Sequence, residues 1–547
     1  MLSTTPRATL PVKIPYVEAV RHAQRTTSAT LWTAAALFAA ATTLIAPVAW
    51  AQQRVVPVDS ARVNAVWAGH PVDFALVAKG DTLYAAYYTY AGTNASKLVT
   101  VSMRDPATGT WRHKTLTGAA ATLGWDSHNS ITMTVDAQGL LHVAGNMHNN
   151  PLRYWRSDVA GEIDSLKQVT SMTGTQEASV TYPVFVKGPG SDLVFIYRDG
   201  GSGSGNHIVN KWDPATRTWG RLLTTNLFSG SSTTGTRSVY FGDNDAGPVA
   251  GPDGWYHLFW FWRATSNAAT THRVSYIRSP NLTDWFTATT VPVTLPISFD
   301  NNQGVIVDNV PQFAGLINRG QIGFDSQNRP IITYHKFDST AAGGYTQCYN
   351  ARLENGSWVI YKTTSWPYRW DFGGQGSLVI QIQLGPVTRQ PDGRLTQWYS
   401  HWQLGRGVMV LSEATLQPIQ VLPDAYWPQA LDTGYRVENS TSTGSPLRMQ
   451  VNWTSVRSPS NPAVVHALRW ETWPENADQA RAVSPPAGDL MYYRMSDPNA
   501  VAIAPSVRSN PATVRPLVLR RVGGKVVVVP DGEGMMDMRG RVLMPRE

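Results

Sequence analysis

Short stretches that alternate apolar and polar residues, or that are rich in Val, Ile, Tyr and Trp, recur along most of the chain. Residues 193–197 (LVFIY) and 255–262 (WYHLFWFW) are typical examples, and clusters of Gly, Pro, Asn or Asp bound them. Runs of this kind between turn signals predict β-strands, and no long helical pattern competes with them. The pattern therefore predicts an all-β protein.

The predicted strands recur in units of roughly fifty to seventy residues, the range expected of propeller blades. A turn marker opens most units, at residues 79–81, 136–139, 190–192, 252–254, 325–328 and 391–393. A second marker, DPATGTW at 105–111, returns as DPATRTW at 213–219, with looser copies at 279–285 and 354–358. We count six clear units and a less regular seventh over residues 435–495. This repetition predicts a β-propeller with seven blades, because radial repetition protects the edges of the sheets.

The ends of the chain differ from the repeated part. A positively charged region is followed by an apolar run over residues 31–48 and by Ala49-Trp50-Ala51, a small-x-small cleavage pattern. We interpret residues 1–51 as a signal peptide rather than a membrane anchor, and expect a secreted or periplasmic protein. Residues 52–496 form the predicted propeller. Residues 497–547 form a tail of unknown role, which becomes strand-rich from residue 514.

Composition narrows the choice of partner. Of the formal net charge of +8 over 547 residues, +3 falls within the first 51 residues. The remaining excess is modest and no Lys/Arg block is present, which argues against nucleic acid and suits an acidic polysaccharide. We expect no membrane partner after removal of the signal peptide, and we expect a monomer. Cys348 is the only cysteine, so an internal disulfide is excluded.

The segment 125–156 carries the most concentrated chemistry. His128 and Asn129 precede its first predicted strand, and His148 and Asn149 follow its second. In an antiparallel hairpin these two positions lie at the same end, so both imidazoles are expected on one rim. Because histidine exchanges a proton near neutral pH, the pair predicts a proton-transfer site. The alternative is that the histidines only cap loops.

Polar residues also recur where the second strand of each unit ends. These positions are Asn146 to His148, Arg198 with Asp199, Arg263, His335 and His401. Functional residues favour loops held by a rigid scaffold, so this rim is the predicted site. In the alternative interpretation these groups only pair with one another and seal the face.

Several motifs in a fixed order carry a family resemblance. They are DSHNS at 126–130, GLLHVAGNMHNNPLRYWRS at 139–157, TYP at 181–183, FIYRDGGSGSG at 195–205 and GWYHLFWFWR at 254–263. The series, over residues 126–376, resembles the BNR-repeat-containing proteins that include the ulvan-lyase type of polysaccharide lyases.

The resemblance implies a seven-bladed propeller that cleaves a uronic-acid polysaccharide, such as a rhamnosyl-glucuronate glycan, by β-elimination. Arg198 would neutralise the sugar carboxylate, His128 and His148 would hold that carboxylate or act as base, and Tyr182 would donate or shuttle the proton. Tyrosine titrates near 10 in isolation, so the role of Tyr182 needs a nearby cation such as Arg198. Tyr240 matches a substrate-contact tyrosine.

Three further residues are candidate substrate contacts: Asn129, Asn149 and Arg263. Two assignments have structural alternatives. Tyr182 precedes Pro183, so it is also compatible with a strand residue that packs inward. Arg198 is also compatible with an ion pair to Asp199.

The chemistry needs no cofactor, although a structural zinc or calcium ion is compatible with the resemblance. The residues with zinc-binding side chains are His257, His272, His335 and Cys348. The short Cys or His pairs typical of zinc sites are missing, so buried core histidines and a buried thiol are the competing interpretation.

Two other functions compete with the lyase. A sialidase-like glycoside hydrolase needs paired carboxylates, or an arginine cluster with Tyr and Glu, and the rim motifs are poor in Glu. A non-catalytic glycan-binding propeller would use the many Trp and Tyr residues as stacking surfaces.

Overall fold

A computed structural model describes residues 55–498 and the backbone of two later strands. Within that range it leaves out residues 91–96, 118–124, 243–245, 302, 340–342, 425–427, 429–430, 432–448 and 487. The predicted signal peptide lies outside the described residues, as does part of the predicted seventh unit. No helix in the described part of the chain is long and apolar enough to cross a membrane.

The described residues form antiparallel β-sheets and almost no helix, which confirms the all-β prediction. The first sheet along the chain contains β2 (Ala75–Lys79), β3 (Thr82–Tyr90), β4 (Lys97–Arg104) and β5 (Trp111–Thr115). The second contains β6 (Ile131–Val135), β7 (Leu141–Gly145), β9 (Tyr154–Ser157) and β10 (Leu166–Val169). The third contains β8 (His148–Asn150), β11 (Val180–Lys187), β12 (Leu193–Asp199), β13 (Asn206–Asp213) and β14 (Thr218–Arg221).

Three further sheets follow in chain order. The fourth contains β15 (Ser238–Phe241), β16 (Val249–Ala250), β17 (Tyr256–Arg263), β18 (Thr271–Ser279) and β19 (Ile306–Asp308). The fifth contains β20 (Gln321–Phe324), β21 (Pro330–Phe337), β22 (Thr346–Glu354) and β23 (Ser357–Lys362). The sixth contains β24 (Ile382–Arg389), β25 (Leu395–His401), β26 (Gly405–Leu411) and β27 (Pro418–Pro423).

The seventh sheet joins the two ends of the repeated part. It contains β28 (Gln450–Arg457), β29 (Val464–Thr472), β30 (Gly488–Ser496) and β1 (Val56–Val66), with β1 hydrogen-bonded to β30. A separate hairpin, β31 (Leu517–Val522) and β32 (Lys525–Pro530), lies in the predicted tail. Short 3-10 helices in the described part of the chain include η2 (Ile163–Ser165), η3 (Pro189–Ser191) and η4 (Ala268–Thr270).

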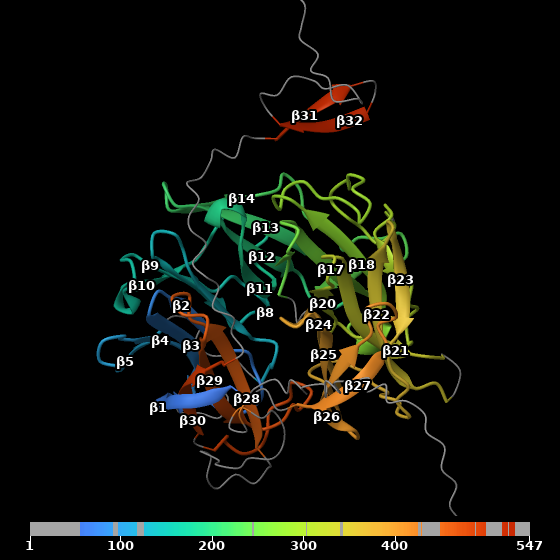
Figure 1. Cartoon of the computed structure of the whole chain (residues 1–547). Helices are drawn as coiled ribbons and strands as arrows, with labels where there is room; N and C mark the ends of the chain where they lie inside the picture. Colours follow the sequence, from blue (N-terminus) through green and yellow to red (C-terminus); the bar gives the residue numbers. More distant parts are fainter. Residues whose placement is uncertain are drawn as a thin grey trace, which may run out of the picture. The chain divides into compact units, whose positions relative to one another are not determined.

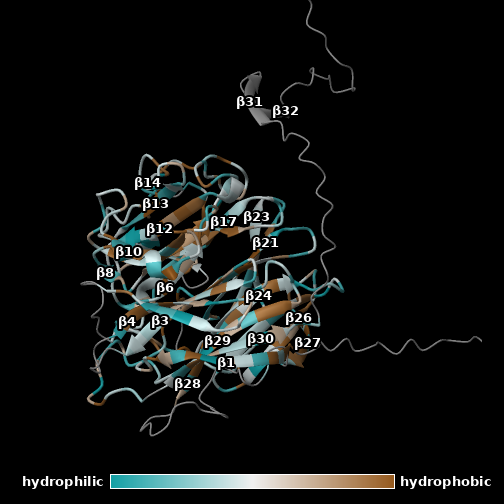
Figure 2. Cartoon of the chain, turned by 90° about the vertical axis from the view of Figure 1, so that its left-hand side faces the viewer, coloured by the Kyte–Doolittle hydropathy of each residue, from teal (hydrophilic) through white to brown (hydrophobic). Residues whose placement is uncertain are grey.

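Successive sheets lie side by side (Figure 1), because residues of β2 contact β6, β11 contacts β6, β13 contacts β15, β20 contacts β24, and β2 contacts β28. The apolar cores lie between neighbouring sheets. One of them combines Phe259 and Tyr276 of the fourth sheet with Ile322 and Tyr334 of the fifth. Figure 2 shows the hydrophobic colour concentrated on strands, while loops are mainly hydrophilic. Packing therefore occupies the strands and leaves the loops at the sheet ends available for a site.

The repeated DPAT turns have a clear physical cause. Asp105 Oδ1 accepts a hydrogen bond from the Ala107 amide at 2.7 Å, and Asp213 Oδ1 accepts one from the Ala215 amide at 2.9 Å. The tryptophan that ends the second copy, Trp219, is buried and donates its Nε1–H to the Tyr154 hydroxyl of the neighbouring sheet at 3.2 Å. Trp219 therefore packs between two sheets.

Candidate functional site

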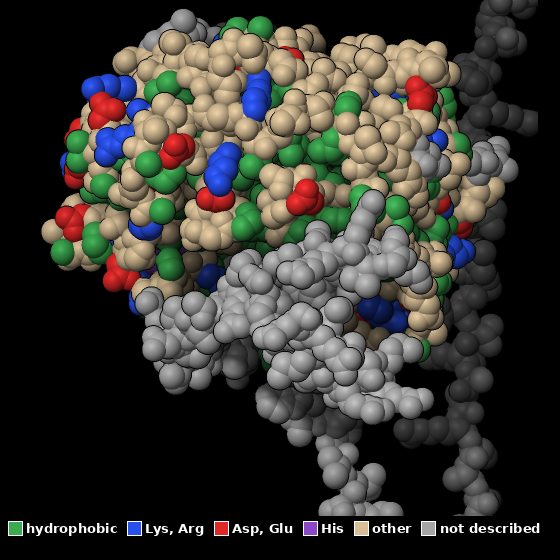
Figure 3. All heavy atoms as spheres, turned by 90° about the horizontal axis from the view of Figure 1, so that it is seen from above, with side chains coloured by type: hydrophobic (Ala, Val, Ile, Leu, Met, Phe, Trp, Pro, Cys, Tyr) green, Lys and Arg blue, Asp and Glu red, His purple; other side chains and the backbone are tan. Residues whose placement is uncertain are grey.

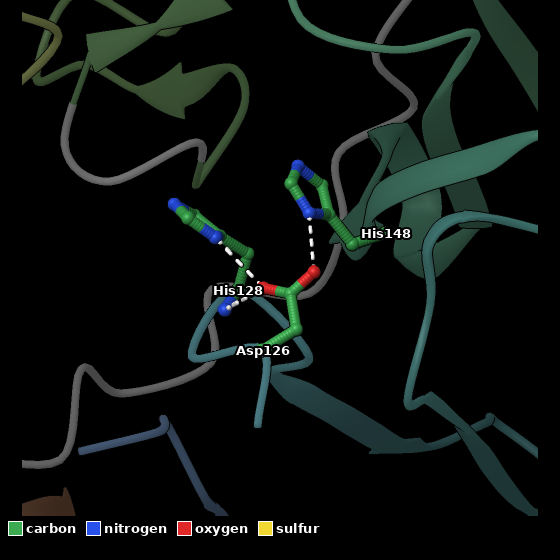
Figure 4. A group of neighbouring side chains, drawn as sticks. All are labelled: Asp126, His128 and His148. Atoms are coloured by element: carbon green, nitrogen blue, oxygen red, sulfur yellow. Dashed lines mark hydrogen bonds and ion pairs between the residues drawn. The ribbon is translucent and has the colours of Figure 1, made fainter. Parts of the chain in front are cut away.

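The two predicted histidines meet at one carboxylate. His128 lies in the loop before β6, and His148 begins β8 after the β6–β7 hairpin. His128 Nδ1 lies 2.8 Å from Asp126 Oδ1, and His148 Nδ1 lies 2.6 Å from Asp126 Oδ2 (Figure 4). The two rings stack with their centroids 4.5 Å apart. The prediction that both imidazoles share one rim is therefore realised in the structure.

The backbone around His148 explains how it leaves its own hairpin. Asn146 and Asn149 adopt left-handed conformations with φ of 64° and 62°. The chain then passes to the next sheet, where β8 pairs with β11 and the Asn149 amide donates to Thr181 Oγ1 at 2.8 Å. Asn149 is exposed at this crossing, whereas Asn129 is buried with its backbone carbonyl bonded to the Tyr88 hydroxyl.

A second carboxylate distinguishes the two histidines. Asp478 Oδ2 lies 3.2 Å from His128 Nδ1, and the amide and hydroxyl of Ser127 both donate to Asp478 Oδ1 at 3.0 Å. Burial lowers the pKa of His128, but its bonds to Asp126 and Asp478 outweigh burial and raise the pKa to about 10. Near neutral pH His128 is therefore an imidazolium.

His148 has the opposite electrostatics. Burial lowers its pKa, and the charged His128 lowers it further, against the effect of Asp126. Burial also raises the pKa of the Asp126 carboxyl, yet its bonds to the two histidines hold that pKa well below its usual range. An ionised Asp126 accepts the proton on Nδ1, so neutral His148 carries its lone pair on Nε2. This wall of the site thus combines a charged imidazole with a neutral one.

Tyr182 is turned toward the histidines by an irregular strand. It has a φ of 49° within β11, at the register shift between Thr181 and Val184. Such bulges re-aim a side chain. The ring centroid of Tyr182 lies 5.5 Å from that of His148, 6.0 Å from that of His128 and 5.9 Å from that of Tyr240.

Arg198 lies behind the two tyrosines. Its side chain is 0% exposed, and its guanidinium donates to the backbone carbonyls of Gly200 at 3.3 Å and Val239 at 3.4 Å. The guanidinium carbon is 5.1 Å from the Tyr182 ring centroid and 4.7 Å from the Tyr240 ring centroid. The cation that the role of Tyr182 requires is therefore present. The guanidinium bonds backbone rather than Asp199.

A polar cavity of about 360 Å³ lies beside these groups. Four predicted residues line it, namely His128, Tyr182, Tyr240 and Arg263. The Arg263 guanidinium stacks 4.1 Å from the Tyr240 ring centroid, with Nε donating to Thr271 Oγ1 at 3.0 Å and Nη2 to Asn318 Oδ1 at 2.6 Å. Arg198, Asn129 and Asn149 do not belong to the lining, and His148 contacts it through His128 and Tyr182.

The sequence analysis missed three charged residues of the lining, Asp73, Arg319 and Glu475. They come from the segments before β2, before β20 and after β29, and no local motif marks any of them. Asp126 is the first residue of the DSHNS motif, so the sequence already showed an acidic residue two positions before His128. Asp478 had no such signal.

The four predicted metal ligands do not assemble into one site. His257 bonds Tyr276 and Asp253 at 2.6 and 2.9 Å, His272 bonds the Thr270 carbonyl, and His335 bonds the Gly315 carbonyl. Cys348 is buried against Gln397. Among the described residues, the group with ligand atoms close enough for one ion is Asp126, His128 and His148, within 4.8 Å. An ion bound there would displace the two imidazole protons that Asp126 accepts.

Repeated antiparallel sheets with a polar cavity built by loops define the class of this protein, an all-β repeat protein. Comparison with known proteins gives the family. The BNR repeat-containing family matches residues 82–366, just over half of the chain. The chain therefore belongs to the BNR repeat-containing family. No curated protein is significantly similar to it in sequence.

Solved structures resemble a large part of the chain. The crystal structure of the polysaccharide lyase Uly1 is similar over 82% of this chain and 99% of that chain, with a TM-score of 0.53 and 12% identity. An ulvan lyase bound to -[GlcA(1-4)Rha3S]- covers 80% and 96%, with a TM-score of 0.49 and 13% identity. An alpha-L-arabinanase of Penicillium chrysogenum covers 68% and 94%, with a TM-score of 0.37 and 9% identity. The similarity to Uly1 shows a shared fold.

Proposed function

We propose that the protein is a secreted polysaccharide lyase that cleaves a uronic-acid-containing polysaccharide by β-elimination. The observation that carries the proposal is a neutral histidine, His148, fixed by the carboxylate that also holds the charged His128. Tyr182 stands beside both rings, and the Arg263 guanidinium lines the same cavity. A base, an acid and cations are the three components that elimination from a uronate needs.

In the proposed reaction, the cavity first neutralises the sugar carboxylate so that the C5 proton becomes acidic. His128 and Arg263 are the lining cations suited to this contact, and buried Arg198 is a positioning residue behind the tyrosines. His148 Nε2 removes the C5 proton, the C5 electron pair forms the C4–C5 double bond, and the C4–O4 bond breaks. The Tyr182 hydroxyl protonates the departing O4, and the proton on His148 then restores Tyr182.

We also propose that the seven sheets of four or five strands are the blades of one closed propeller. Pairing of β1 with β30 joins the beginning and end of the repeated part in one sheet, which is the arrangement that closure requires. Figure 3 shows one face on which Lys/Arg and Asp/Glu side chains are interspersed. Such a surface suits a substrate recognised within the cavity rather than across a basic surface patch.

A glycoside hydrolase is a second candidate, favoured by one observation. Asp73 and Glu475 both line the cavity together with arginines and tyrosines. Carboxyl pairs, or an arginine cluster with Tyr and Glu, serve hydrolysis. Here Glu475 rather than His148 would be indispensable, and the product would contain no double bond.

One assay separates these functions. The protein is incubated with ulvan and other glucuronate-containing polysaccharides, while absorbance near 235 nm, where unsaturated uronyl products absorb, and reducing ends are both recorded. We expect both signals to rise together in the wild type, and His148→Ala to abolish both. His113→Ala, which changes an exposed histidine on β5, is the matched control and should remain active.

The other outcomes are equally informative. Reducing ends without absorbance, lost in Glu475→Gln, would establish the hydrolase. Measurable binding with neither signal would leave a non-catalytic glycan-binding protein.

A further inference from the structure

We propose that Lys97, which is buried behind the loop carrying Asp126 and His128, is a positioning residue whose ammonium charge keeps His148 free of a second proton. The inference rests on the proposed function, because it explains how the base stays available. Lys97 does not belong to the cavity lining, so it would act through the residues of that loop and not by contact with substrate.

Lys97 is a charged side chain enclosed by rings. It begins β4 and is 0% exposed, and its Nζ lies 4.8 Å from the Trp67 ring centroid and 4.7 Å from the Tyr88 ring centroid. Nζ also lies 3.4 Å from His70 Nε2. Because His70 Nδ1 lies 3.0 Å from the Pro71 carbonyl oxygen, Nδ1 carries the proton and Nε2 accepts from the ammonium. Two π faces and a neutral imidazole therefore surround the charge.

The same two aromatic rings hold the loop of the site at both of its ends. The Trp67 ring contacts the ring of Trp125, at the start of the loop, with centroids 5.3 Å apart. The Tyr88 hydroxyl donates to the backbone carbonyl of Asn129, at the end of the loop, at 2.6 Å. The enclosure of Lys97 is therefore also the wall that supports the loop.

The charges of the site give the ammonium its role. Asp126, Asp478 and ionised His128 together carry a net charge of −1. That negative charge favours a second proton on His148, because His148 Nδ1 lies 2.6 Å from Asp126 Oδ2. Asp126 and Asp478 are also the carboxylates whose charges act on Lys97. The ammonium thus balances the group from behind the loop, and His148 stays neutral.

The pH range in which Lys97 is charged fits this role. Burial lowers the pKa of Lys97 to about 7, while Asp126 and Asp478 raise it. The ammonium is therefore present below neutral pH. This is the range in which His148 would otherwise take up a proton.

The other titratable groups nearby do not take over this role. Around Lys97 the structure describes His70 before β2, Tyr88 on β3, Asp126 before β6 and Asp478 after β29. Around His148 it describes Asp126, His128, Tyr182 and Arg198. Burial raises the pKa of Tyr88 well above its ordinary value and lowers that of His70 to about 3, so both are neutral near pH 7. The two carboxylates are therefore the charges that Lys97 compensates.

The test compares Lys97→Met with Lys187→Met, which alters an exposed lysine on β11. Methionine keeps an unbranched side chain without the charge, and an apolar replacement of a buried charge is commonly neutral or stabilising, so the variant is expected to fold. We expect Lys97→Met to move the acid limb of kcat/KM upward by about one pH unit, with kcat/KM above the limb changed less than about twofold. Lys187→Met should leave the limb in place.

A charged replacement separates charge from packing. Lys97→Arg keeps a positive charge at every pH and is expected to hold the limb at or below its wild-type position. A limb that moves upward equally in Lys97→Met and Lys97→Arg would overturn the proposal, because packing would then be the cause. An unmoved limb in Lys97→Met, with or without a uniform loss of rate, would also overturn it.

Histidine NMR separates failure of this inference from failure of the proposed function. The titration of His148 is followed in protein labelled with ¹⁵N at histidine, and its signal is assigned by its loss in His148→Gln. If the wild type forms no unsaturated product but His148 binds its proton about tenfold more tightly in Lys97→Met, the function fails and the role of Lys97 stands. If His148 titrates identically in the wild type and in Lys97→Met, the inference is wrong whatever the activity.

Discussion

Two histidine–carboxylate pairs lie close together in the chain and have opposite surroundings. His142 Nε2 is 3.4 Å from Asp136 Oδ2, its Nδ1 is 2.7 Å from the Tyr154 hydroxyl, and its side chain is 0% exposed. His148 Nδ1 is 2.6 Å from Asp126, but its side chain is 20% exposed and borders Tyr182. The same two side-chain types therefore serve a core in one place and border a cavity in the other.

The buried pair also has counterparts in other sheets, whereas the His128–Asp126–His148 group does not recur among the described residues. His257 bonds Tyr276 and Asp253 in the fourth sheet, and His466 bonds Tyr492 at 2.8 Å in the seventh. A bond from a strand histidine to a tyrosine of the next strand is thus part of the repeat. The difference teaches that access to the cavity and departure from the repeat, rather than the residue pair itself, mark the site.

The largest effect is expected when His148, the histidine at the site, is replaced. We expect His148→Ala to lower the rate of product formation by about 10²–10⁴-fold, since it removes the proposed base. The measurement is the initial rate near 235 nm on a cleaved polysaccharide, together with the midpoint of chemical unfolding. A variant that keeps most of its activity would show that His148 only shapes the cavity.

The next largest effect is expected when His142, the buried histidine, is replaced. His142→Ala removes one hydrogen-bond partner from the buried Tyr154 hydroxyl and one from the buried Asp136 carboxylate, and it opens a cavity beside Trp212. We expect a loss of about 2–4 kcal/mol in the free energy of unfolding, measured by denaturant titration. Activity per folded molecule should remain near that of the wild type. A strong loss of rate with unchanged stability would reverse the roles of the two histidines.

Local sequence patterns predict the parts of this molecule that are local in space. The strands, the DPAT turns and the shared rim of His128 and His148 all follow from neighbouring residues and hairpin geometry. Asp73, Arg319 and Glu475 come from different segments and meet only because the sheets follow one another in the fold. The residues next to them in the sequence give no indication that these three side chains line one cavity.

The position of Arg198 shows a second limit. Its place at the end of β12 was predictable, but its burial depends on the rings of Tyr182 and Tyr240, which come from β11 and β15. The irregular backbone that turns Tyr182 toward the cavity also depends on pairing with strands on both sides. A sequence pattern indicates which residues are present, whereas the tertiary structure decides which one reaches the cavity.

The pH dependence of activity distinguishes the two histidines of the site, His128 and His148. His148 must be neutral, and its pKa is lowered, so activity should fall with acidification only below pH about 6.5. His128 must be charged, and its pKa is raised to about 10, so activity should fall as pH rises toward that value. The pKa of His128 is higher in the folded protein than in the unfolded chain, so charged His128 also stabilises the fold. This stabilisation is complete below the pKa of the unfolded chain and is lost as pH rises through about 10.

Asp478→Asn tests which group sets the alkaline limb. It removes one of the two carboxylates that raise the pKa of His128, so we expect the limb to move down by about one pH unit. The limb is read from kcat/KM against pH, with circular dichroism as a check of folding. An unmoved limb would assign it to another group, such as the Tyr182 hydroxyl.

The smallest expected effect is found by comparing two serine variants. One serine lies at the site beside His128, and the other lies in the core beside His142. Ser127 Oγ donates to Asp478 Oδ1 at 3.0 Å, but the Ser127 amide donates to the same oxygen, so Ser127→Ala leaves Asp478 held. Ser157 Oγ is buried and accepts from the Leu141 amide at 2.8 Å, beside His142. We expect Ser127→Ala to lower kcat/KM by a few-fold at most, with the free energy of unfolding changed by less than about 1 kcal/mol. Ser157→Ala should instead cost about 1–3 kcal/mol of stability at unchanged activity, because it leaves a buried amide unpaired. If both serines affected only stability, Asp478 would be part of the core, and the boundary between the two regions would lie at His128 itself.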